Sequence, residues 1–303
     1  MASHSEITAR LAAMVLTLCT PAVARANQQH SAESLAKPLV TSSSSRLSIV
    51  SDLYVRVNPE GVMLYVGPVY NHAYSLGSSI LLRNLYVRGG LLLGSNPAYG
   101  QASAFVEASP LAVLQLKVQA DWFGFYGANG ALLRFADRDS RFGRSEQKSL
   151  KGQEATGTGY RVLLTPVLRA RVGPIVARNQ TDVAYYQLDS EPGYYLEWEY
   201  DTLLKNRDWV VSNRAALLGV LWEGKGTETL LLGPAHEVTH AFGTDITRHR
   251  LELMIYLEPA TRWLGLDRPR LFGLTGLNLR DRNRDNQPFL VVGAGADFDI
   301  WSR

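Results

Sequence analysis

The chain has 303 residues, of which 46% are hydrophobic and 19% are charged, and its formal net charge is +3. This composition supports a folded body, and the absence of a basic block gives no indication of nucleic acid as a partner. After the N-terminal segment no apolar run reaches the roughly 18 residues of a membrane-spanning helix, which excludes ordinary membrane helices.

The first 26 residues have the pattern of a secretory signal peptide. Arg10 supplies a positive charge, Leu11–Leu18 form an apolar core, and an A-x-A cleavage site ends at Ala26. The single cysteine, Cys19, lies in this segment, so a chain cleaved after Ala26 would have neither disulfides nor thiol chemistry. Residues 27–46 are polar and end in a run of serines, and we expect a disordered periplasmic lead-in.

The clearest strand pattern lies in Leu111–Tyr126. Every second residue from Leu114 to Trp122 is apolar, and each residue between them is polar. Because side chains on a strand alternate between the two faces of the sheet, this segment has one apolar and one polar face. It is long for a strand of a soluble protein and long enough to cross a bilayer on a tilt.

The same alternation recurs along the chain, with turn residues between the segments. It predicts an all-β fold of about 12–14 strands, the lower number applying if the weak segments at Ala131 and Asp182 do not span. The expected strands cover residues 47–57, 62–74, 80–93, 101–108, 111–126, 131–136, 160–176, 182–188, 194–204, 209–222, 227–233, 248–257, 270–279 and 288–301.

Residues 137–158 differ from this pattern because they are strongly charged, contain glycine and show no periodicity. We expect the longest loop here, and long loops in small barrels often carry function or are mobile. With fourteen strands and both ends in the periplasm, this loop would lie on the periplasmic side, where turns are usually short. One strand fewer before it would place it on the outer side.

Alternation alone fits a soluble β protein as well as a membrane barrel. The polar rows contain charges of both signs, as expected for residues that face one another across a lumen, and strands of ten or more residues recur. Aromatic residues gather at predicted strand ends, as interfacial girdles do. They are Trp122, Phe123, Tyr126, Tyr194, Tyr195, Trp198, Trp209, Trp222 and Trp301.

On this pattern, residues 47–301 resemble the general class of Gram-negative outer-membrane β-barrel proteins. The resemblance implies one transmembrane antiparallel up-and-down β-barrel domain over residues 47–303, located in the outer membrane. It implies outer-membrane lipid and lipopolysaccharide as surroundings and the barrel-assembly machinery as a partner. A periplasmic partner docking on residues 27–46 is an open alternative, and no cofactor is implied.

Residues 236–240 spell H-E-x-x-H, the motif of zinc peptidases. That chemistry needs a helix, because two histidines four residues apart on a strand lie about 13 Å from each other. Pro234 and Gly243 leave room for barely two helical turns, and Ile246 occupies the position of the third zinc ligand. We expect a polar loop between strands, with a metal site at His236 and His240 as the weaker alternative.

The charged row that should face the lumen is the stronger functional signal. Opposed rings of basic and acidic side chains can form a selective constriction, or can pair across the interior and fill it. A barrel of 12 to 14 strands is wider than the eight-stranded kind that side chains fill, which favours a channel. The expected pore-lining residues are Lys117, Asp121, Arg161, Arg169, Arg171, Glu197, Glu199, Asp201, Arg214, Glu252 and Glu258.

Three functions fit these observations. The first is a channel or exporter for small polar solutes or saccharides, with no enzymatic activity. The second is a structural or partner-docking barrel without transport. The third is a surface metallohydrolase that uses His236, Glu237 and His240; the His-x-Ser pair of barrel phospholipases is absent from the chain.

Overall fold

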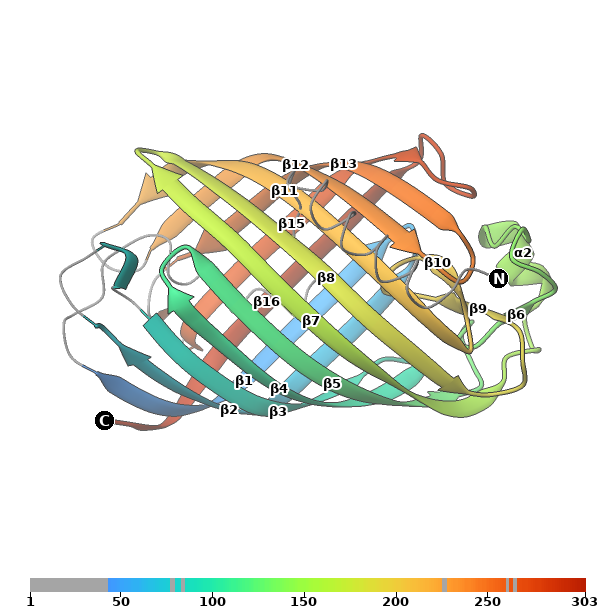
Figure 1. Ribbon diagram of the computed structural model, residues 1–303, viewed down its shortest axis with the longest axis horizontal. Coiled ribbons are helices and arrows are strands. Elements are labelled where there is room, and N and C mark those ends of the chain that lie inside the picture. The colour runs from blue at the N-terminus through green and yellow to red at the C-terminus, as the bar shows by residue number, and fades with distance from the viewer. Residues whose placement is uncertain (1–42, 77–79, 83–84, 225–227, 260–261, 264–265) are drawn as a thin grey trace, which may run out of the picture.

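The computed structural model describes residues 43–76, 80–82, 85–224, 228–259, 262–263 and 266–303. In these residues twelve long antiparallel strands form a closed barrel (Figure 1). The barrel strands are β1 (Ser44–Val57), β2 (Gly61–Tyr74), β3 (Leu85–Ser95), β4 (Tyr99–Leu111), β5 (Leu114–Tyr126), β7 (Thr156–Val172), β8 (Ile175–Asp189), β11 (Arg207–Glu223), β12 (Thr229–Ala241), β13 (Ile246–Glu258), β15 (Leu266–Arg280) and β16 (Pro288–Ser302).

Two pairings close the ring. β1 pairs with β16 from Arg46 opposite Ser302 to Val57 opposite Leu290, and β13 pairs with β15. Every strand of the wall therefore has a neighbour on both sides, which satisfies its backbone hydrogen bonds and leaves no open sheet edge. The predicted fold class, an all-β up-and-down antiparallel barrel, is confirmed, and the strand number is twelve.

The two expected strands that do not span are residues 131–136 and 194–204, whereas the sequence indicated residues 131–136 and 182–188 as the weak pair. Asp182 belongs to the long strand β8, whereas the segment at Ala131 contributes only the short β6 (Arg134–Phe135). Residues 194–204 alternate like a strand but fold as a hairpin of β9 (Tyr194–Glu197) and β10 (Thr202–Lys205). The chain reverses at a turn in which Asp201 has a φ of 48°, a left-handed conformation that no strand continues through.

The remaining described elements are short. β6, β9 and β10 form a separate three-stranded sheet, and α2 (Arg144–Ser149) lies in the same loop as β6. The two-residue strand β14 (Arg262–Trp263) pairs with β15, and η2 (Ile80–Leu82) is a single 3-10 turn. None of the helices in the described residues is long and apolar enough to cross a membrane.

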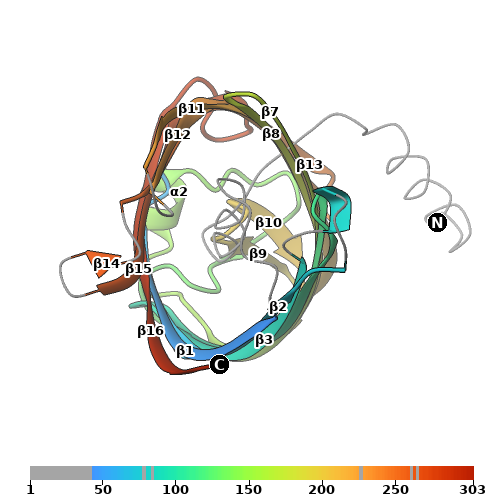
Figure 2. The same cartoon turned by 90° about the vertical axis from the view of Figure 1, so that its left-hand side faces the viewer.

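The two ends of the barrel differ. The start of β1 and the end of β16 lie together at one end, called here the terminal end. The small sheet and α2 lie at the opposite end, called here the loop end (Figure 1). With twelve spanning strands, residues 137–158 follow β5 at the loop end, so they lie opposite the terminal end and not on the side of the termini, as a count of fourteen had implied (Figure 1). Seen along the axis, β9 and β10 lie within the outline of the ring (Figure 2).

Side chains of each barrel strand alternate between the two faces of the wall. The exposed, mainly apolar side chains face outward, and the buried side chains between them face the lumen. In β5, Val118 is 53% exposed on the outside, whereas the adjacent Gln119 is 1% exposed. Aromatic side chains meet on the outer face near the loop end, where the Tyr185 ring lies 6.3 Å from Tyr160 and 5.1 Å from Trp209. This arrangement is typical of an interfacial girdle.

Not all the predicted girdle aromatics belong to it. Trp222 and Trp301 are exposed near the terminal end and Trp122 near the loop end, as expected. Phe123 instead lies buried on the lumen row of β5, and Tyr195 is buried in the small sheet. These residues occupy strand ends in the sequence, but the alternation and the β9–β10 turn direct them inward.

Candidate functional site

The lumen brings together most of the residues predicted to line it. Seven are buried on barrel strands: Lys117, Asp121, Arg161, Arg169, Arg214, Glu252 and Glu258. Arg171 lies at the terminal end of β7, where it pairs with Glu223 at 2.9 Å and is partly exposed. Glu197, Glu199 and Asp201 lie in the β9–β10 hairpin instead of a barrel strand, which corrects the row predicted for them.

One group of lumen side chains, called here the Asp121 cluster, contains Asp121, Arg161 and Glu199. The Asp121 Oδ1 atom accepts hydrogen bonds from Gln101 Nε2 at 2.8 Å, from Ser103 Oγ at 2.6 Å and from Gln119 Nε2 at 2.7 Å. Its Oδ2 atom accepts from Arg161 Nε at 2.7 Å. A buried carboxylate with four donors is well compensated for its loss of water.

Arg161 joins this cluster to the hairpin. Its guanidinium is fully buried and donates to Glu199 as well as to Asp121. The same group lies 5.6 Å from the ring centres of both Phe123 and Tyr186. Carboxylates and aromatic faces therefore surround this cation, and together they replace its hydration.

A second group, called here the arginine cluster, lies mainly on β11, β12 and β13. It contains four guanidiniums and three carboxylates: Arg214, Arg248, Arg250, Arg284, Asp201, Glu237 and Glu252. Arg214 pairs with Glu237 and lies 2.7 Å from Glu252, and Arg248 donates to Glu237 at 2.7 Å. Formally, this cluster has one more cation than anion.

Sequence reasoning missed four members of the arginine cluster. Arg248 and Arg250 share a row with Glu252, so the two-residue period of that strand could have identified them. Glu237 was assigned to a loop motif, and Arg284 lies in the β15–β16 connection, which has no periodicity.

The hairpin Tyr194–Lys205, called here the mouth hairpin, is held by both clusters. Glu199 pairs with Arg161, whereas Asp201 accepts from Arg284 Nε at 2.7 Å. Asp201 also lies 3.7 Å from Arg248 and 3.6 Å from Arg250. Burial by itself raises the pKa of the Asp201 carboxyl, but the neighbouring guanidiniums, led by that of Arg284, outweigh it and hold this pKa below its ordinary value.

The base of the mouth hairpin is fixed to the β12–β13 turn. Asp208 accepts hydrogen bonds from the backbone N–H groups of Lys205 at 3.1 Å and Gly243 at 2.6 Å. A Cβ atom on Gly243 would clash with the Asp208 carboxylate and displace it from these contacts, so the close approach favours glycine. The buried Thr244 hydroxyl donates to the Leu203 carbonyl at 2.8 Å, and the hairpin is thus attached at its base and at its turn.

The H-E-x-x-H motif lies in β12, so the predicted loop is wrong. His236 and His240 are on the outward row, and Glu237 points into the lumen toward Arg214 and Arg248. His240 Nδ1 is 2.8 Å from Thr247 Oγ1. The helical geometry of a zinc peptidase is therefore not present at this motif, because the glutamate and the histidines face opposite sides of the sheet. No group of three or more His, Cys, Asp or Glu side chains in the described residues is placed to hold a metal ion.

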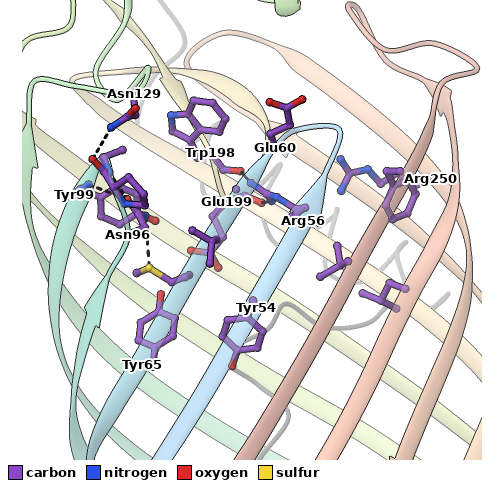
Figure 3. A pocket seen from close by; sticks show the side chains of 18 of the residues that line it. Tyr54, Arg56, Glu60, Tyr65, Asn96, Tyr99, Asn129, Trp198, Glu199 and Arg250 are labelled. Atoms are coloured by element: carbon purple, nitrogen blue, oxygen red, sulfur yellow. Dashed lines mark hydrogen bonds between the residues drawn. The ribbon is translucent and has the colours of Figure 1, made fainter.

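A cavity of about 500 Å³ lies at the loop end, between the mouth hairpin and the turns that join β1 to β2 and β3 to β4 (Figure 3). Arg56 lines it and donates to the carbonyl groups of Trp198 and Glu199 at the hairpin turn. Aromatic and aliphatic side chains form much of the rest. They include Tyr54, Met63, Tyr65, Tyr99, Trp198, Leu274, Phe289 and Val291.

The lumen is not uniformly polar, which corrects the simple picture of an apolar outer and a charged inner row. A contiguous set of buried apolar and aromatic side chains faces inward, mainly from β1 to β3 and from β11 to β16. Tyr54, Tyr65, Leu274 and Phe289 belong both to this set and to the cavity wall. We call this set the apolar sector; it continues from the cavity along the inner wall.

No protein-family model and no curated protein matches this chain. It is similar to the β-domain of the Bordetella autotransporter BrkA, with a TM-score of 0.40 and 11% identity over 84% of this chain and 98% of that one. The translocator domain of the autotransporter NalP from Neisseria meningitidis gives 0.38 and 11% over 97% of each chain. OmpT, an outer membrane protein of Vibrio cholerae, gives 0.33 and 8% over 87% and 100%.

The closed antiparallel barrel of this chain confirms the architecture that the resemblance to outer-membrane β-barrel proteins implied, and no specific family is assigned.

Proposed function

We propose that this chain is an outer-membrane channel or exporter for small polar solutes, with no enzymatic activity, and that the mouth hairpin narrows its loop end. The observation that carries this proposal is a closed barrel whose inner wall holds charges of both signs and whose mouth contains a cavity of about 500 Å³. Charged groups on a lumen wall can replace part of a solute's hydration during passage.

In this setting the outward apolar rows would contact outer-membrane lipid and lipopolysaccharide, and the barrel-assembly machinery would insert the chain. Saccharides are a second class of substrate that is consistent with the charged lumen row predicted from the sequence. The apolar sector favours, among small polar solutes, those that carry an apolar part as well.

The test is single-channel recording in planar bilayers with the folded chain. We expect discrete conductance steps and an altered ion selectivity in Arg169→Ala, which removes a buried lumen cation. Heat-denatured protein is the control. Folded protein that gives no steps, even when the ion pairs of Asp201 are weakened by Asp201→Asn, would favour a structural or docking barrel instead.

A further inference from the structure

In the described part of the chain, two buried guanidinium groups at the mouth have N–H donors that make no hydrogen bond. Arg214 and Arg250 are each 3% exposed, and both line the cavity. Arg214 Nη1 and Arg250 Nη2 make no hydrogen bond within the described residues, although Arg250 Nη2 lies at ion-pair distance, 3.6 Å, from the Asp201 carboxylate. A buried N–H group without a partner costs free energy comparable to a lost hydrogen bond, so an acceptor at this position would be favourable.

Both guanidiniums are held in place by other contacts. Arg250 donates from Nε to Asn278 Oδ1 at 2.8 Å and lies 4.6 Å from the centre of the Phe289 ring. Arg214 is fixed by Glu237 and Glu252. Their remaining donors are therefore positioned before any ligand arrives, which lowers the entropy cost of binding.

The charge of the surroundings favours an anion. The arginine cluster has four guanidiniums and three carboxylates, and one added negative charge would balance it. Arg161 Nη2 also lacks an acceptor, but that guanidinium lies between two aromatic rings and does not line the cavity.

The other walls of the cavity are partly apolar, and their polar members are Arg56, Glu60, Asn96, Asn129 and Glu199 (Figure 3). Tyr54, Tyr65, Leu274 and Phe289 lead from the arginine side into the apolar sector. A ligand that satisfies both surfaces has an anionic group at one end and an aromatic or aliphatic body at the other.

We propose that the mouth cavity binds small organic anions with an apolar body, such as aromatic carboxylates. The carboxylate accepts from Arg214 and Arg250, and the body packs against the apolar sector. Only the role of this site in transport rests on the proposed channel function, because anion binding does not require conductance.

The test is isothermal titration of the folded chain in detergent with 2-naphthoate, with a detergent-only blank. We expect binding of 2-naphthoate that is at least about tenfold tighter than that of the uncharged 2-naphthalenemethanol or of acetate, which lacks the apolar body. Equal binding of the alcohol and the carboxylate would overturn the proposal. This comparison needs no variant, so it stands even if a substitution prevents folding.

Variants then locate the site. Arg214→Gln and Arg250→Gln should each weaken 2-naphthoate binding about tenfold or more. The matched control is Arg178→Gln, which removes another buried lumen guanidinium outside the cavity and should leave binding unchanged. An equal loss in all three variants would contradict a site at the mouth.

The outcome separates the two proposals. Charge-dependent 2-naphthoate binding without any conductance would retain the site and reject the channel. Conductance with binding that ignores charge would retain the channel and reject the site.

Discussion

The two charged clusters of the lumen have opposite balances. The Asp121 cluster holds two carboxylates around one guanidinium, whereas the arginine cluster holds four guanidiniums around three carboxylates. Amide and hydroxyl donors satisfy the Asp121 carboxylate of the first cluster, whereas in the second cluster the Arg214 and Arg250 donors that make no hydrogen bond belong to residues that line the cavity. We infer that the first cluster mainly stabilises the wall, whereas the second can also receive a ligand.

The mouth hairpin connects these clusters, because Glu199 belongs to one and Asp201 to the other. A substitution in either cluster therefore affects the stability of the barrel wall, the position of the hairpin, or both. The net charge of each cluster predicts which variants change stability or conductance most.

The largest effect is expected in the Asp121 cluster. Arg161→Gln removes its only cation and leaves Asp121 and Glu199 as neighbouring buried or half-buried anions. Removing one partner of a buried pair costs about 3 kcal/mol or more. The free energy of unfolding, measured by urea titration in lipid vesicles, should fall by about this amount, and a second change, Asp121→Asn, should recover part of it. An unchanged unfolding midpoint would contradict the assigned role.

The second-largest effect is expected on conductance through the loop end, where the mouth hairpin lies. Asp201→Asn raises the formal charge of the arginine cluster from +1 to +2, and asparagine tolerates the left-handed backbone at this position. The matched variant Glu199→Gln instead brings the Asp121 cluster from −1 to 0. We therefore expect Asp201→Asn to loosen the turn of the hairpin and raise single-channel conductance more than Glu199→Gln does. The reverse order would show that the cluster charges do not control the hairpin.

Low pH should weaken the ion pairs that Asp201 forms with Arg248, Arg250 and Arg284. Because the folded-state pKa of Asp201 lies below its ordinary value, its ion pairs contribute stability that is fully present above the unfolded-state value and is lost as the pH falls through the folded-state value. The contribution of Asp201 to conductance should therefore change only at low pH, with an increase as the pH falls below about 4. The increase should be absent in Asp201→Asn, and an equal acid response in that variant would assign it to another group.

The smallest effect is expected outside the clusters. Arg134 and Glu191 form a 2.6 Å ion pair, but both side chains are largely exposed. Exposed pairs contribute little, so Glu191→Gln should change the free energy of unfolding by no more than about 0.5 kcal/mol. A loss as large as that of Arg161→Gln would remove the distinction between cluster and surface pairs.

The periodicity of the sequence predicted the barrel well because each spanning strand must present one row to each side. It could not distinguish the hairpin at Tyr194–Lys205 from a strand, since its two short strands continue the same alternation and the reversal depends on one left-handed residue, Asp201. It also could not predict the partners of Arg214 or Arg250, because cross-strand register is a property of the closed sheet.

The assignment of the two rows can be tested directly with nitroxide labels. Val118→Cys and Leu164→Cys introduce attachment points on the outer face, and Glu191→Cys introduces one in an exposed loop. In lipid vesicles, relaxation of the labels at 118 and 164 should be enhanced by oxygen and not by a water-soluble nickel complex, and the label at 191 should show the opposite preference. Access of the nickel complex to the outer-face labels would show that these rows do not contact hydrocarbon, and would contradict the membrane barrel.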